Sequence, residues 1–352
     1  MKLENGSVIP HSCPDIGEQE IEALVACARS MHVKGGERVR VLEQGIAQHQ
    51  GYAGAVATTT GSQAIHLALR AFFAGRQAIV GLPSYLCRSV YDAVCLAGCR
   101  PQLLDIDPFT FSVAVEQATR IRLDAVIVPH MFGIRAPIET FLAAGLFVIE
   151  DCAQRLALPP ADPSEPKAPV RIVSFEATKL ITCGEGGMVL SDDPAILHRS
   201  RQLRDAPYDF AEPAVQLPLT DLQASMALVQ WQRLPEFLAK RRRLADFYLR
   251  FLEGEFSKHI VPAMRSIATH HFRFLIWVDE PATFLQQGLA QGVSFRRPIA
   301  PLSLHTLFGA SGSFPVTDEV FSHLISLPLY PALSLEDAMK VAQSASKGLR
   351  AG

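Results

Sequence analysis

The sequence lacks long apolar runs, long basic runs and paired cysteine motifs. No stretch reaches the roughly 18 uninterrupted apolar residues of a membrane span, and the N-terminus has no apolar core of signal-peptide length. The net charge is only −2, and the densest basic cluster, residues 240–243, falls in an amphipathic pattern typical of a solvated helix face. We therefore expect a cytoplasmic protein that binds neither nucleic acid nor a membrane.

The seven cysteines are scattered along the chain. Cys95 and Cys99 lie four residues apart on a predicted helix, which is a possible spacing for metal ligands. No histidine or second cysteine pair accompanies them, so small buried residues are the simpler interpretation and no metal site is expected. Reduced thiols also fit a cytoplasmic protein.

The 352 residues are enough for one large and one smaller domain. Short apolar runs alternate with amphipathic helical patterns, which predicts an α/β fold with a largely parallel sheet. Helices are expected at residues 17–30, 37–50 and 62–74, and strands at residues 53–57, 78–82, 102–104, 125–128, 146–150, 171–175 and 188–190.

The second half of the chain shows a different order of predicted helices and strands. Residues 157–169 carry five prolines and are expected to form a loop. Thr220 begins a helical pattern that extends to about residue 251, and Pro235 should kink or break it. A strand at 272–278 and helices at 282–291 and 334–348 then indicate an α+β arrangement. We expect a large domain over residues 1–240, which includes the N-terminal segment, and a small domain over residues 241–352.

Polar motifs follow three of the predicted strands, at the strand ends where open α/β sheets bind ligands. The first is the turn TTTGSQ at residues 58–63, which leads into a helix. Free backbone N–H groups at a helix N-terminus, with hydroxyls and a glycine nearby, favour a phosphate site. An ordinary helix cap is the alternative.

The second motif is the carboxylate of Asp151, which directly follows a buried apolar strand. A buried carboxylate is unfavourable unless a cationic group meets it, and a protonated pyridine nitrogen would be such a partner. A helix-capping or metal-binding aspartate is the alternative.

The third motif is Lys179, which lies in a loop rich in serine, threonine and glycine after another apolar strand. A lysine in such a pocket can lose its proton and attack a carbonyl carbon. Most lysines are surface residues, so the argument depends on the order of the three motifs. A phosphate turn, then an aspartate, then a lysine is the order found in pyridoxal 5'-phosphate (PLP) enzymes of fold type I.

From about residue 10 to residue 345 the chain resembles the DegT/StrS family of sugar-nucleotide aminotransferases. Besides the three motifs, the resemblance is carried by HMFG at residues 130–133, EDCAQ at 150–154, DLQA at 221–224 and LPLYP at 327–331. It implies the three-layer PLP-transferase fold of aspartate aminotransferase, with a mostly parallel mixed central sheet and a smaller α+β C-terminal domain.

The resemblance also implies roles for individual residues. Lys179 is similar to the lysine that holds PLP as a Schiff base and moves a proton during catalysis. Asp151 would pair with the pyridine nitrogen, and Gln154 would bond the phenolic oxygen of the ring. The phosphate would be held by Gly61, Ser62, the backbone of Gln63, and Ser174. Members of the family are homodimers with active sites at the subunit interface.

The chain departs from the family pattern at several positions. Cys87 stands where the family stacks an aromatic side chain on the ring, so Tyr85 or another neighbour would have to replace it. Glu176 stands where the family has a histidine. Gln216 stands where a partner subunit supplies an asparagine to the phosphate, and the flanking glycine and arginine of that segment are absent.

Other departures concern the small domain. The usual Tyr-His pair of the family aligns with His271-Phe272, and its Pro-Leu-His becomes Pro301-Leu302-Ser303. The cofactor chemistry is therefore largely retained, while the substrate-facing parts have changed.

The leading hypothesis is a PLP-dependent aminotransferase that moves an amino group from glutamate to a nucleotide-linked keto sugar. Arg296 is a candidate for gripping a carboxylate or phosphate, with an exposed surface arginine as the alternative. Some relatives deoxygenate sugars with a histidine at the Schiff-base position, and Lys179 argues against that chemistry. A non-catalytic or regulatory homologue, and an enzyme for a non-sugar carbonyl compound, are further alternatives.

Overall fold

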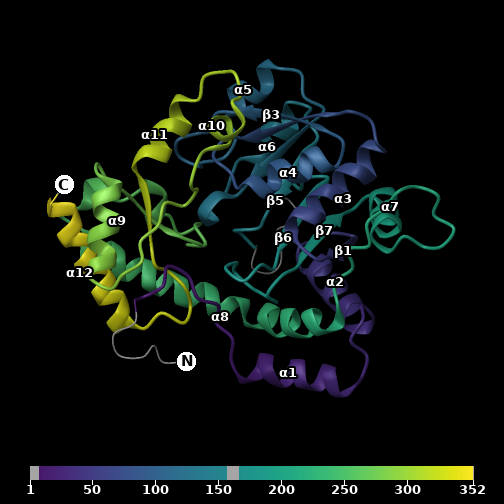
Figure 1. The fold of residues 1–352 in the computed structure, drawn as a ribbon, viewed down its shortest axis with the longest axis horizontal. Helices are drawn as coiled ribbons and strands as arrows, with labels where there is room; N and C mark the ends of the chain where they lie inside the picture. Colours follow the sequence, from purple (N-terminus) through teal and green to yellow (C-terminus); the bar gives the residue numbers. More distant parts are fainter. Residues whose placement is uncertain (1–7, 157–165, 352) are drawn as a thin grey trace.

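A central mixed sheet organises the computed structural model, which describes residues 8–156 and 166–351. Within these residues, seven strands lie in the order β1-β7-β6-β5-β4-β2-β3 (Figure 1). β7 runs antiparallel to both β1 and β6, and the other neighbouring pairs are parallel. The strands are β1 (Gly54–Thr58), β2 (Ile79–Pro83), β3 (Arg100–Leu104), β4 (Ala125–Pro129), β5 (Val148–Asp151), β6 (Val170–Ser174) and β7 (Gly187–Ser191). The predicted α/β fold with a mostly parallel mixed sheet is confirmed.

Helices cover both faces of this sheet. The helices of this part of the chain are α1 (Glu18–Arg29), which packs against α8, and α2 (Glu37–His49), α3 (Gly61–Phe73), α4 (Arg88–Leu96), α5 (Val115–Arg120), α6 (Ile138–Ala143), α7 (Pro194–Asp205) and α8 (Asp221–Leu252). Because side chains alternate along a strand, Ile172 of β6 joins the core beneath α3 and α4. The next residue, Val173, joins the core beneath α2 and α8. The result is the expected three-layer arrangement.

The long helix α8 crosses the molecule next to α1 and α2 (Figure 1). Thr220 begins it with a reciprocal cap, in which its side chain accepts from the Gln223 N–H and the Gln223 side chain accepts from the Thr220 N–H. The helix continues through Pro235 for 32 residues, so the break predicted there is absent. None of the helices in the described part of the chain is long and apolar enough to cross a membrane.

A second, two-stranded sheet lies beyond α8. β8 (Phe274–Trp277) and β9 (Leu324–Leu327) pair antiparallel, with α9 (Pro281–Ala290), α10 (Leu304–Phe308), α11 (Pro315–His323) and α12 (Leu335–Ala351) in the same part of the chain. This agrees with the expected α+β arrangement, although the sequence analysis did not predict α10, α11 and β9. The division at residue 240 stays a prediction, since α8 continues through that residue.

Two local expectations need a correction or a limit. Cys99 does not share a helix with Cys95, because α4 ends at Leu96. Most of the expected proline-rich loop, residues 157–165, lies outside the described residues.

Asp221, the first residue of α8, caps a neighbouring helix. Its buried carboxylate accepts N–H bonds from Gly36 at 2.8 Å, Val39 at 3.1 Å and Arg38 at 3.3 Å, all at the start of α2. The N-cap residue of α2 is Gly36, which has no side chain to satisfy these donors. Asp221 therefore holds the N-terminal helices against α8.

Asp221→Ala should lower the free energy of unfolding by roughly 2–3 kcal/mol, because buried N–H groups lose their acceptor. The matched control on the same helix is Asp246→Ala, which removes a half-exposed i,i+4 pair with Arg242 and should cost less than about 0.5 kcal/mol. Urea unfolding monitored by circular dichroism measures both. Equal losses in the two variants would show that Asp221 does not act as a cap.

Candidate active site

The three sequence motifs meet at one edge of the sheet. β1, β5 and β6 point in the same direction, so their carboxyl ends bring Thr58, Asp151 and Ser174 together. Gly187, at the start of β7, is the register partner of both Thr58 and Ser174. This is the ligand-binding edge expected for an open α/β sheet.

The turn between β1 and α3 is packed tightly against this edge. A Cβ on Gly61 would lie 2.9 Å from the Cβ of Ser174, and a Cβ on Gly187 would lie 2.4 Å from the carbonyl oxygen of Thr60. Both positions therefore require glycine. The N–H groups of Gly61 and Ser62 are in the first turn of α3 and have no acceptor within the helix, so the turn offers donors for an anion.

One of the predicted phosphate contacts is already engaged. The Gln63 N–H donates to the Thr60 side chain at 3.1 Å, which is the ordinary cap that the sequence left open as an alternative. The phosphate interpretation and the cap are compatible, because the turn offers the N–H groups of Gly61 and Ser62 besides the capped N–H of Gln63. Ser174 lies opposite Gly61 and completes the cradle.

Asp151 is a buried carboxylate with little compensation. It is 6% exposed, and its Oδ1 accepts one N–H bond, from Ala153 at 2.9 Å. Burial raises the pKa of Asp151, while this N–H bond and the charge of Lys179 act in the opposite direction. A cationic donor such as a protonated pyridine nitrogen fits this carboxylate, because it would supply the missing charge.

The preceding residue, Glu150, is compensated fully. Its Oε2 accepts from Arg171 Nε at 2.8 Å, and its Oε1 accepts from His130 Nε2 at 2.7 Å. His130 Nδ1 accepts the Ala136 N–H at 2.9 Å, so the proton resides on Nε2. Burial would raise the pKa of Glu150, but the His130 bond and the Arg171 charge outweigh it and lower the pKa to about 2.

This network was missed by the sequence analysis, since Glu150 and Arg171 become neighbours only through the register of β5 with β6. His130, Glu150 and Cys152 also place possible ligand atoms within 4.8 Å of one another. The guanidinium of Arg171 already occupies the carboxylate, and His130 Nε2 is protonated. The group is therefore a buried ion-pair network and a poor cation site.

Lys179 is half-buried in the turn between β6 and β7. Its Nζ lies 5.6 Å from the ring centroid of Phe272, just before β8. Within residues 8–156 and 166–351 it forms no ion pair with a carboxylate. Gln154 lies near the same edge, and its Oε1 accepts the Phe132 N–H at 2.7 Å. Its Nε2 donates to Met131 Sδ at 3.9 Å. These bonds orient the amide and leave its second N–H as a donor for a ligand oxygen.

Three of the departures from the family pattern lie at or near the surface. Cys87 is exposed at the N-cap of α4, and Gln216 is exposed in the loop before α8. Tyr85 is only 1% exposed and packs edge-on against Phe132, so it does not line an open space where a ring could stack. Glu176 accepts the N–H and hydroxyl of Thr178, at 3.0 and 2.6 Å.

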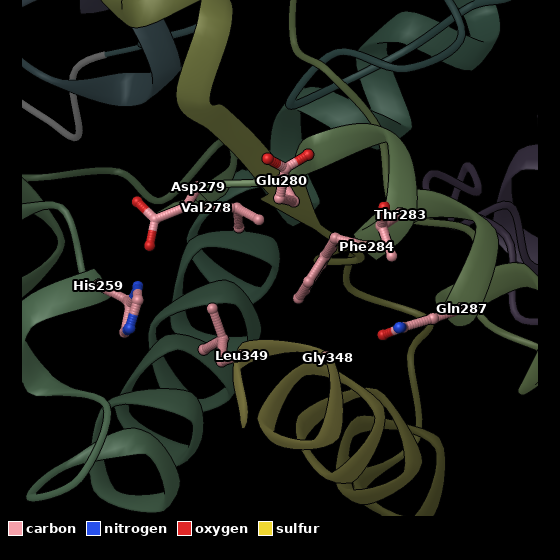
Figure 2. A pocket seen from close by; sticks show the side chains of 9 residues that line it. All are labelled: His259, Val278, Asp279, Glu280, Thr283, Phe284, Gln287, Gly348 and Leu349. Carbon is pink, nitrogen blue, oxygen red and sulfur yellow. The ribbon is translucent and has the colours of Figure 1, made fainter. Parts of the chain in front are cut away.

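Two cavities differ sharply in their suitability as a site. Figure 2 shows one between α9 and α12, lined by His259, Phe284 and Leu349 among others. Its volume of about 20 Å³ holds little more than one water molecule. The other has about 670 Å³ and is lined in part by Thr178, the residue next to Lys179. Of these two cavities, the larger is therefore the one that borders the motif of Lys179.

The fold is that of the PLP-dependent aminotransferases of fold type I. More specifically, the chain belongs to the DegT/DnrJ/EryC1/StrS aminotransferase family, whose model matches residues 14–346. The predicted family and enzyme class are thus confirmed.

Solved structures show the same fold over nearly the whole chain. TlmJ, an aminotransferase from Streptoalloteichus hindustanus, is 24% identical with a TM-score of 0.88, over 98% of this chain and 100% of that one. DesI, solved in the presence of its TDP-sugar product, is 24% identical with a TM-score of 0.87, over 99% of this chain and 94% of that one. Spr1654 of Streptococcus pneumoniae, in its PMP form, is 21% identical with a TM-score of 0.87, over 98% and 99% of the two chains. Spr1654 has also been solved in its PLP form, so this family uses pyridoxal phosphate.

Glu150→Gln should destabilise the fold by roughly 3–5 kcal/mol at neutral pH, because it leaves the buried Arg171 charge unpaired. The folded-state pKa of Glu150 is lowered from 4.5 to about 2, so its stabilisation is fully present above pH 4.5 and is lost as the pH falls toward 2. The difference in unfolding free energy between wild type and variant should shrink over that interval. Guanidinium titrations at several pH values measure it.

The matched control is Glu336→Gln, which removes an exposed i,i+4 pair with Lys340 and should cost less than about 1 kcal/mol at every pH. A Glu150→Gln variant as stable as this control would contradict the role assigned to the network.

Proposed function

We propose that the protein is a PLP-dependent aminotransferase that attaches the cofactor through Lys179 and moves an amino group from glutamate to a nucleotide-linked keto sugar. The observation that carries the proposal is that Asp151 and Lys179 occur at the same edge of the sheet and each lacks an ion pair in the part of the chain that the structure describes. One is a buried carboxylate without a cationic partner in contact, and the other is a half-buried lysine without an ion pair among the described residues. A cofactor with a cationic ring and a reactive carbonyl group satisfies both.

The proposed cofactor contacts follow from the geometry of the edge. Asp151 would hold the ring nitrogen protonated, and the Gln154 amide would donate to the phenolic oxygen. The phosphate would bind at the turn and cradle formed by Gly61, Ser62, Gln63 and Ser174. Cys87, which is exposed at the start of α4, would face the ring in place of an aromatic side chain.

When bound, pyridoxal phosphate supplies an electron sink for the carbanion formed at the substrate carbon. The chain's own residues supply proton transfer and positioning. Nζ of Lys179 takes the proton from the α-carbon of the amino donor. The carboxylate of Asp151 would pair with the protonated ring nitrogen, and the charge of Lys179 favours the ionised carboxylate against the raising of its pKa by burial.

A homodimer is part of the proposal, with Gln216 reaching the phosphate site of the partner subunit. Exposed apolar side chains support it, since they concentrate in the N-terminal region of the chain. The exposed apolar residues of that region are Val8, Ile16, Ile21, Val25, Met31, Val33 and Val41. The nucleotide-linked acceptor is supported by membership of the family and by DesI, whose structure holds a TDP-sugar product.

Two alternatives are distinguishable from this proposal. A non-catalytic homologue would have no need of a lysine at position 179, and retention of Lys179 favours catalysis. An enzyme for a non-sugar carbonyl substrate would share the same cofactor chemistry. A panel of carbonyl compounds, offered to the protein in its pyridoxamine phosphate form, separates sugar-nucleotide acceptors from cyclic ketones and simple keto acids.

Purified protein given PLP should become yellow and lose that colour on addition of L-glutamate. Lys179→Ala should show no lysine-linked absorption and should transfer amino groups at least about a hundredfold more slowly, because the proton-transfer group is gone. Absorption spectroscopy and single-turnover kinetics measure these effects. Lys347→Ala, at an exposed position of α12, is the matched control and should behave as wild type. A wild-type protein that gains no absorption with PLP would overturn the proposal.

A further inference from the structure

The 670 Å³ cavity beside Lys179 has a one-sided charge. It lies between the N-terminal segment, the turn that follows β6, and residues 294–300. Arg273, Arg296 and Arg297 line it, and no aspartate or glutamate is among its lining residues. None of the three guanidinium groups forms an ion pair with a carboxylate in residues 8–156 and 166–351. Several cations around one cavity without a counterion are unfavourable unless a ligand brings negative charge.

The three arginines are not equivalent. Arg297 Nη1 donates to the backbone carbonyls of Phe321 and Ser322, and its guanidinium stacks on the Phe321 ring, so it serves the structure of α11. Arg296 is exposed, its backbone pairs with Ser326, and its side chain makes no bond within the described residues. Arg296 is therefore free to bind a ligand.

Arg273 is positioned toward both the cavity and the reactive lysine. Its Nη1 donates to the Ser12 hydroxyl at 2.7 Å, a neutral partner that leaves the positive charge uncompensated. Its guanidinium lies 4.4 Å from the centroid of the Phe272 ring, the same ring that Lys179 Nζ approaches to 5.6 Å. An anion bound at Arg273 would consequently lie within the reach of one substrate molecule from Lys179.

The arginine charges in the cavity shift the pKa values of its titratable groups. Burial lowers the pKa of Arg273 to about 10, and the charge of Arg296 adds to this effect while Glu176 opposes it. Burial and the charges of these two arginines lower the pKa of His11 to about 2. His11 is therefore neutral at physiological pH and does not add a fourth charge. Its Nε2 instead shares a hydrogen bond with Ser326.

We propose that Arg273 and Arg296 form an anion subsite that binds a carboxylate or phosphate group of a substrate. This inference rests on the proposed function, because the bound anion is part of a substrate only if the protein is that enzyme. Arginine is suited to the task, because its planar fork makes two parallel bonds to a carboxylate or phosphate. The anionic group belongs either to a dicarboxylic amino donor or to the diphosphate of a nucleotide-linked acceptor.

The test measures anion binding directly, on protein saturated with PLP so that the cofactor's own phosphate site is filled. Isothermal titration calorimetry is run with glutarate as the dicarboxylate probe and with inorganic diphosphate as the phosphate probe. Wild type should bind one of them, and the one bound identifies the source of the anion. Arg296→Gln and Arg273→Gln should each weaken that binding at least about tenfold, as expected for the loss of a charged hydrogen bond.

The matched control is Arg122→Gln, an exposed arginine away from the cavity, which should change the affinity less than about twofold. Arg273→Lys keeps the charge without the fork and should fall between wild type and Arg273→Gln, which separates recognition from misfolding. Arg296 is exposed, so its variant tests the subsite without a risk to the core. Wild-type protein that binds neither probe at millimolar concentration, or arginine variants that bind like wild type, would overturn the inference.

Failure of the proposed function is a separate result. Protein that shows no PLP absorption but binds an anion through Arg273 and Arg296 would keep the subsite and lose the aminotransferase assignment. Protein that transaminates while both arginine variants keep wild-type anion binding and wild-type KM for both substrates would keep the assignment and lose the subsite.

Discussion

The end of strand β5 places two adjacent carboxylates in the interior, and the low dielectric there requires that each be compensated. Glu150 meets Arg171 and His130 in direct contact, so its charge is balanced by the protein itself. Asp151 receives a single N–H bond, and its nearest opposite charges act from a distance. The first carboxylate links β5 to β6, while the second has no cationic side chain in contact among the described residues. The second is therefore the one that the proposed function assigns to the cofactor.

Close packing of glycines shapes the part of this edge that lies next to α3. Gly61 and Gly187 have no side chains, which lets the turn before α3 approach Ser174 and the start of β7. The first-turn N–H groups of α3 are therefore held close to the end of β6 and the start of β7. A rigid scaffold of this kind would keep the proposed cofactor in one position.

Much of this architecture could be predicted because it depends on local patterns. Short buried runs predicted the strands, and the motifs around Gly61, Asp151 and Lys179 predicted an edge at which they meet. What could not be predicted depends on contacts between distant residues. Glu150 and Arg171 become partners through strand register alone. The helix through Pro235 persists because α8 packs along its length against α1, α2 and the sheet, which outweighs the local cost of proline.

The arginine-lined cavity is the clearest case of distant assembly, since His11, Thr178, Arg273 and Arg296 come from four separate parts of the chain. The positive charge of this cavity is opposite in sign to that of the carboxylate at the edge of the sheet. Asp151 and Arg273 form no ion pair among the described residues, and Lys179 acts electrostatically on the first and shares the Phe272 ring with the second. If Lys179 holds the cofactor as proposed, an acidic group and a basic group near it favour ligands that are cationic at one end and anionic at the other. A cofactor ring with a protonated nitrogen, joined to an acidic substrate, has this distribution of charge. Among the departures from the family pattern, Glu176 acts on this distribution of charge, since it opposes the lowering of the Arg273 pKa by burial. A residue that differs from the family therefore bears on the positive charge that faces the cavity.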